Sequence, residues 1–114
     1  MKHVHYDEVE AQEVEEAGAQ GAKVRWLVAQ DDGAPNFLMR RFELEPGGRT
    51  PRHAHDWEHE VYILEGEGTV FGEGGERPFR PGDVVYMPPG EEHSFTAGNG
   101  PVAFLCLIPR TDKS

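Results

Sequence analysis

The sequence predicts an all-β fold, either a closed barrel or a two-sheet jelly roll, in a single domain. Glycine and proline occur 14 and 9 times among 114 residues, and they separate short apolar segments. That pattern is typical of strands joined by tight turns. About ten such segments follow one another at short intervals, as they do in barrels and jelly rolls.

The expected strands are short and bounded by turn residues. They cover residues 23–28, 36–44, 50–55, 59–64, 69–71, 76–79, 84–87, 93–96 and 102–108. Pro46, Gly47 and Gly48 are expected to turn the chain after the second of these strands. The last strand is apolar on both faces, which predicts that both faces are covered.

The barrel core is expected at residues 23–109, with residues 1–22 as an N-terminal segment of the same domain, 1–114. Residues 8–20 are rich in alanine and glutamate, a composition that favours a helix. Glycines at the end of this stretch interrupt it and weaken that prediction.

Composition argues against several classes of partner and location. The chain has 11 basic and 21 acidic residues, a formal net charge of −10, so it lacks the basic surface that nucleic acids and anionic membranes require. No signal peptide and no membrane-spanning segment is expected. Cys106 is the single cysteine, which excludes an internal disulfide and makes a reducing cytoplasm the expected compartment.

Four of the six histidines lie between residues 53 and 93. His53 and His55 are one residue apart, so on a strand their side chains would share a face, about 7 Å apart at Cα. A tight turn would bring His59 to the same point, and His93 would arrive from another strand. Unrelated surface histidines are the alternative, but three within seven residues favour a transition-metal site.

The spacing around these histidines resembles the first motif of the cupin superfamily. Gly47 is followed after five residues by His53 and His55, then after three residues by His59 and after six by Gly66. This motif usually has glutamate at the position of His59. The neighbouring Glu60 fits that role poorly, because it would point to the opposite face of the strand.

A second cupin motif is also present. Gly82, Pro88, Gly90 and His93 follow its spacing, and Ala97 stands where the motif usually ends in asparagine. The two motifs together imply a double-stranded β-helix, the cupin jelly-roll barrel. They also imply one metal ion held by His53, His55, His59 and His93.

Three stretches, residues 34–37, 53–61 and 104–109, further resemble the compact four-histidine manganese monocupins first seen in thermophilic bacteria. That resemblance implies a homodimer, and manganese in the barrel supporting oxidative cleavage of alkenes with a peroxide. It also places Phe104 and Cys106 near the metal pocket, whereas the residues by themselves favour ordinary core packing for both.

Arg40 is the remaining candidate for the pocket. It shares the inward face of its predicted strand with Leu38, Phe42 and Leu44, and a charged group in an apolar row needs a partner. A surface or interface salt bridge is the alternative role.

Four neutral imidazoles would leave a divalent site at +2, against +1 for three histidines and a glutamate. We therefore expect a Lewis-acidic ion that favours an anionic ligand, with two open coordination positions. Mn²⁺ is the expected occupant, and Fe, Ni, Cu, Co or Zn are chemically acceptable.

Three functions fit these residues. The leading hypothesis is an oxidoreductase of dioxygenase type that activates peroxide or dioxygen to oxidise or cleave a small unsaturated organic molecule. The alternatives are a non-redox metal isomerase or lyase, in which the metal polarises a carbonyl, and a cupin that binds a small ligand without catalysis. Barrel architecture does not choose among them.

Overall fold

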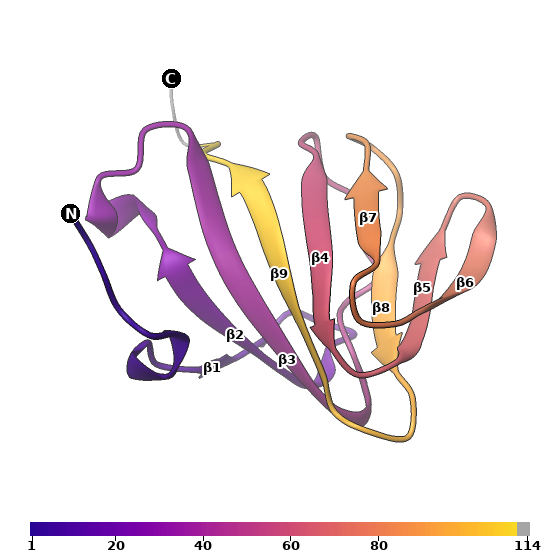
Figure 1. Cartoon of the computed structure of the whole chain (residues 1–114). Helices are drawn as coiled ribbons and strands as arrows, with labels where there is room; N and C mark the ends of the chain where they lie inside the picture. The colour runs from indigo at the N-terminus through magenta and orange to yellow at the C-terminus, as the bar shows by residue number, and fades with distance from the viewer. Residues whose placement is uncertain (112–114) are drawn as a thin grey trace.

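The computed structural model describes residues 1–111 and confirms the all-β fold class (Figure 1). The strands of this part of the chain are β1 (Gln12–Glu13), β2 (Gln20–Val28), β3 (Phe37–Arg49), β4 (His59–Glu65), β5 (Gly68–Gly72), β6 (Gly75–Phe79), β7 (Val84–Met87), β8 (Ser94–Ala97) and β9 (Val102–Pro109). Helical structure in it is confined to two single 3₁₀ turns, η1 (Tyr6–Glu8) and η2 (Gln30–Asp32). The composition of residues 8–20 therefore produces no α-helix.

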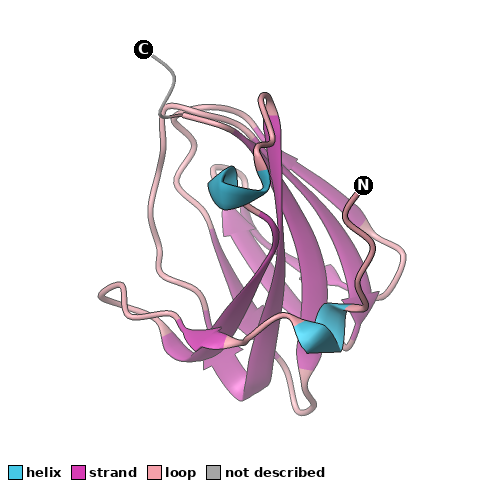
Figure 2. Cartoon of the chain, turned by 90° about the vertical axis from the view of Figure 1, so that its left-hand side faces the viewer, coloured by secondary structure: helices cyan, strands magenta, loops and turns pink. Residues whose placement is uncertain are grey.

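All strand pairs in this sheet are antiparallel, and the sheet curls because β3 belongs to both of its halves. The order is β6-β5-β8-β3-β9-β4-β7, with β2 also on β3 and β1 on β2. The first part of β3 pairs with β9 from Phe37 to Leu44, whereas Arg49 at its end pairs with Thr96 of β8. Seen from the side, the result is a half-barrel (Figure 2).

The turn predicted immediately after Leu44 is instead a bulge within β3. Between the pairs Ala22–Leu44 and Gln20–Arg49, β3 contains four residues and β2 contains one. Gly47 adopts a φ of +73° there, a left-handed conformation that glycine tolerates without steric cost. The expected turn was therefore wrong, and the bulge bends the strand from one half of the sheet to the other.

One end of the barrel interior is filled by apolar side chains. The largest fully buried side chains are Leu44, Ile63, Val102 and Phe104. Because side chains two residues apart share a strand face, the same inward rows of β3 and β9 continue to Arg40 and Cys106, which pair in register. Along these two strands, the inward side chains therefore change from apolar at the packed end to more polar at Arg40 and Cys106.

The outer face of the final strand is covered only in part within a single chain. The inward residues from Val102 to Cys106 are buried, and so is Ala103 on the outer face, but Leu105 and Leu107 on that face are half-buried. Beside them, Tyr62, Val84 and Tyr86 are 47%, 72% and 54% exposed. The prediction that both faces are covered therefore does not hold for one chain alone. None of the described residues belongs to a helix long and apolar enough to cross a membrane.

Candidate metal centre and pocket

The four histidines converge, although not from the strand that we predicted for residues 50–55. His53 forms an isolated bridge with His93, with backbone N–H to carbonyl distances of 3.1 and 2.9 Å. The carbonyl of His55 accepts a hydrogen bond from the Gly90 N–H at 2.7 Å, which ties this loop to the turn before His93. His59 is the first residue of β4. Backbone pairing between loops, rather than one strand face, brings the rings together.

The imidazole rings form a compact cluster. All six pairs of ring centroids lie between 4.3 and 6.5 Å apart. With a metal–nitrogen distance of about 2.1 Å, rings bound to one ion lie at separations of this order. His55 stands at the edge of the cluster, where its ring stacks on Trp57 at 4.4 Å with an interplanar angle of 7°.

Three of the four rings contact a neighbouring group through Nδ1. These contacts are His53 with Glu16 Oε2 at 2.8 Å, His93 with the Glu91 carbonyl oxygen at 2.9 Å, and His59 with Cys106 Sγ at 3.4 Å. A ring whose Nδ1–H donates in this way offers the lone pair of Nε2 to a metal. His59 Nε2 is buried and has no hydrogen-bond partner, so the donor set fits a divalent ion.

The environment keeps His55, His59 and His93 in the neutral form that binds metals. Burial, followed by the charges of His93 and Arg40, lowers the pKa of His59 to about 3. Burial also lowers the pKa values of His55 and His93 below 6.5. Neutral imidazoles at pH 7 need lose no proton before they bind a cation.

The rings are not already arranged as they would be around an ion. Residues 1–111 contain no group of three or more histidine, cysteine, aspartate or glutamate side chains with the arrangement of a metal site. Ligation by the four histidines therefore stays a prediction, supported by the ring cluster and by the unpartnered nitrogen of His59.

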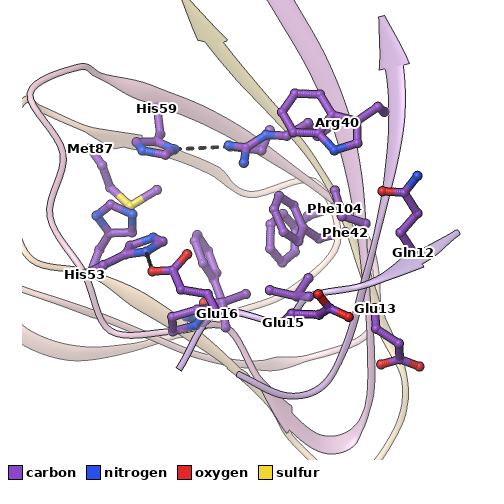
Figure 3. A pocket seen from close by; sticks show the side chains of 18 residues that line it. Gln12, Glu13, Glu15, Glu16, Arg40, Phe42, His53, His59, Met87 and Phe104 are labelled. Carbon is purple, nitrogen blue, oxygen red and sulfur yellow. Dashed lines mark hydrogen bonds and ion pairs between the residues drawn. The ribbon is translucent and has the colours of Figure 1, made fainter. Parts of the chain in front are cut away.

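A cavity of about 340 Å³ opens beside this cluster. Three of the histidines line it, and so do aromatic side chains from β2, β3, β8 and β9, namely Trp26, Phe42, Phe95 and Phe104. The N-terminal segment crosses its mouth with residues 12–16 (Figure 3). Mostly apolar walls with a few convergent polar groups are typical of small-molecule sites.

Arg40 lies in this cavity, and its side chain extends toward His59 (Figure 3). Its Nη2 donates to Cys106 Sγ at 3.0 Å, and its Nε is buried without a partner. The guanidinium carbon lies 5.5 Å from the centre of the Trp26 ring and 4.9 Å from that of Phe42. The structure thus places Arg40 inside the barrel rather than in a surface salt bridge.

Phe104 and Cys106 also face the cavity, and both pack in the core. The Phe104 ring stacks on Phe42 at 5.3 Å and lies 4.6 Å from Phe95. Burial raises the pKa of the Cys106 thiol, and the nearby Arg40 opposes this only in part. The thiol is therefore neutral at pH 7, so it is a weak nucleophile.

Several pocket residues were missed by the sequence analysis. Glu16 lies in an acid-rich segment in which nothing distinguishes it from Glu13 or Glu15. Trp26 lies on a strand that was predicted, on the same face as the buried Val24, and this alternation could have singled it out. Met87 ends β7 against the cavity, and no motif marks it.

Comparison with known proteins now identifies the family. The model of the cupin domain matches residues 40–108, and the chain belongs to this family. Members of the family commonly bind divalent metal ions. The four candidate ligand histidines fall inside the matched region.

Curated relatives of the chain differ in function. An oxalate-binding protein of Thermotoga maritima is 40% identical over 73 residues, 62% of this chain and 60% of that protein. Quercetin 2,3-dioxygenase of Bacillus subtilis is 32% identical over 72 residues, 62% of this chain and 21% of that enzyme. The chain therefore spans less than two thirds of the length of each of these relatives.

Solved structures are similar over almost the whole chain. The polyketide cyclase RemF from Streptomyces resistomycificus matches with a TM-score of 0.90 and 39% identity, over 96% of this chain and 79% of that one. A predicted oxalate decarboxylase from Thermotoga maritima matches with a TM-score of 0.84 and 30% identity, over 96% and 100% of the chains. Relatives with such different functions support the barrel more strongly than any one reaction.

Proposed function

We propose that the protein is a metal-dependent enzyme that oxidises or cleaves a small unsaturated organic molecule with peroxide or dioxygen. His53, His55, His59 and His93 would bind one divalent ion, with Mn²⁺ the leading candidate. The observation that carries the proposal is the cluster of four imidazole rings beside a mostly apolar cavity. When bound, the ion would supply Lewis acidity and open coordination positions for an oxidant and a substrate.

The residues of the chain prepare the site in three ways. The Glu16 carboxylate and the Glu91 carbonyl orient His53 and His93 through Nδ1, which leaves the lone pair of Nε2 to bind an ion. Phe42 and Phe104 form an apolar wall that excludes water from a bound substrate. The neutral Cys106 is a poor nucleophile, so the reaction proposed here uses no covalent attachment to the protein.

A non-redox reaction is the second candidate, and a specific finding favours it. The polyketide cyclase RemF aligns with 96% of this chain at 39% identity. Ring closure needs a polarised carbonyl and no oxidant, which a redox-inactive ion could provide. Binding without turnover is the third candidate, and similarity to the oxalate-binding protein supports it.

Metal replacement separates the first candidate from the second. We would load the protein with Mn²⁺ or with Zn²⁺ and measure oxygen and peroxide consumption on a panel of aryl alkenes. The proposal predicts turnover with Mn²⁺ and none with Zn²⁺, because Zn²⁺ has no redox chemistry. Equal turnover with Zn²⁺ would contradict oxidation and favour the second candidate.

We also propose that the protein forms a cytoplasmic homodimer through the outer face of the sheet. The exposed Tyr62, Val84 and Tyr86 lie there beside Leu105 and Leu107, and exposed apolar side chains on one face favour association. The free thiol of Cys106 supports a reducing compartment. Sedimentation analysis of the wild type and of Tyr62→Lys tests the dimer, which the lysine should weaken. A wild-type monomer would contradict it.

A further inference from the structure

Arg40 differs from Arg25 and Arg41 of the same strand pair in having no acidic partner. Arg25 and Arg41 each donate through Nε to Glu43 Oε2 at 2.9 Å on the outer face of the sheet. Arg40, next to Arg41 in sequence, points inward, and no carboxylate of residues 1–111 forms an ion pair with it. Its polar contact is the Cys106 sulfur, which carries no charge in the thiol form.

An uncompensated cation in this position is costly for the fold. Arg40 is half-buried, and charges removed from water in proteins are normally paired, because their desolvation is unfavourable. The faces of Trp26 and Phe42 offset part of that cost through cation–π contact. They supply no hydrogen-bond acceptor for the buried Nε. The missing acceptor and the missing negative charge can both come from a ligand in the cavity.

We propose that Arg40 binds the carboxylate or enolate oxygen of a planar, unsaturated organic anion. The guanidinium is planar and can donate two parallel hydrogen bonds to a carboxylate. Trp26, Phe42 and Phe104 line the same cavity, and aromatic rings pack well against a flat conjugated body. The arginine would thereby favour a negatively charged ligand, and the aromatic rings would favour a flat one. This inference rests on the proposed function only in taking the cavity to be the substrate site.

The acidic residues at the cavity mouth do not oppose this assignment. Glu13 and Glu15 line the mouth and are exposed to solvent, where salt screens their charges. Glu16 is already in contact with His53. Arg40 lies farther inside, beside the core residue Cys106, where a charge pair is screened much less.

The test compares an acid with its neutral analogue. The probes are trans-cinnamate and cinnamamide, which share one flat conjugated body and differ in charge. Calorimetric titration would measure their dissociation constants for the metal-loaded wild type, Arg40→Gln, Arg40→Lys and Arg41→Gln. The last variant makes the same change of charge one residue away, on the opposite face. Metal content, measured on each preparation, reports separately on the proposed metal site.

We expect the wild type to bind the acid at least about 10-fold more tightly than the amide, the scale of a charge-assisted hydrogen bond. Arg40→Gln should lose that preference, Arg40→Lys should keep part of it, and Arg41→Gln should keep all of it. Repeating the titration after removal of the metal should leave the preference in place, because it belongs to the guanidinium.

Four results would overturn the assignment. The first two concern the wild type: it does not bind the acid at millimolar concentration, or it binds acid and amide equally well. The third is that Arg40→Gln weakens the binding of both ligands equally. The fourth is that Arg40→Gln still prefers the acid when metal is bound and loses this preference when the metal is removed. The last result would make the metal the anion site. A protein that binds no metal but shows the expected pattern of affinities would refute the proposed function and leave the role of Arg40 standing.

Discussion

Arg40 and Arg41 are adjacent on β3, and they occupy opposite faces of the sheet with opposite consequences. Arg41 shares the Glu43 carboxylate with Arg25 on the outer face, an ordinary ion-pair network. Arg40 faces the cavity, touches a thiol and leaves its Nε unpartnered. On the outer face, Arg25, Arg41 and Glu43 are thus paired with one another. The inner face keeps unpartnered nitrogens on Arg40 and His59, and such groups are where a ligand or an ion is expected.

The largest expected effect concerns the inner face, at His59. His59→Ala removes the ring whose Nε2 has no partner, and we expect metal affinity to fall by more than the roughly 10- to 100-fold that loss of an outer-shell contact costs. His59→Glu should keep the metal but lower peroxide turnover, because it reduces the charge of the site. Competition with a chelator measures the affinity, and His3→Ala at the distant N-terminus is the control. An unchanged affinity in His59→Ala would remove this ring from the metal site.

Glu16 joins the N-terminal segment to the inner face through His53. Glu16→Gln replaces a charged acceptor by a neutral one, so we expect metal affinity to fall by roughly 10- to 100-fold. The matched control is Glu15→Gln, which changes an exposed neighbour at the mouth of the same cavity. If the two variants behave alike, the effect belongs to the overall charge of the segment and not to the contact with His53.

Acidification should destabilise the metal-free protein, because His59 on the inner face resists protonation in the fold. The pKa of His59 is lowered to about 3 in the fold, against 6.5 for an ordinary histidine. Below pH 6.5 the unfolded chain therefore binds protons that the folded chain does not, and the free energy of unfolding falls as the pH decreases. Urea unfolding between pH 7 and about pH 5.5, above the titration of most carboxylates, should show this loss. His59→Gln should reduce the slope, and a wild-type stability independent of pH in that window would contradict the account.

The smallest effect is expected on the outer face. Glu43→Gln breaks the contacts to Arg25 and Arg41, and a partly exposed ion pair contributes about 0 to 1 kcal/mol. Thermal unfolding should therefore shift by only a few degrees, with metal content and ligand affinity unchanged. A loss of metal in this variant would mean that the two faces are not independent.

The sequence predicted those parts of the molecule that short-range rules govern. Alternation along residues 36–44 put Arg40 on the inward face of its strand, with a surface salt bridge as the alternative, and the motif spacing predicted that the four histidines lie together. The rest depended on long-range pairing. The bulge at Gly47 arises from the register of β2 against β3, and His53 reaches its position by pairing with His93. Glu16 could not be found, because its partner is 37 residues away.

The most direct test of the central claim is a titration of the protein with Zn²⁺, followed by ¹⁵N NMR of the imidazole nitrogens. Zn²⁺ is diamagnetic and accepts the same imidazole ligands as Mn²⁺. The account predicts saturation at one ion per chain, with Nε2 of His53, His55, His59 and His93 shifting together. Shifts confined to fewer of these rings, or to the terminal histidines, would contradict it.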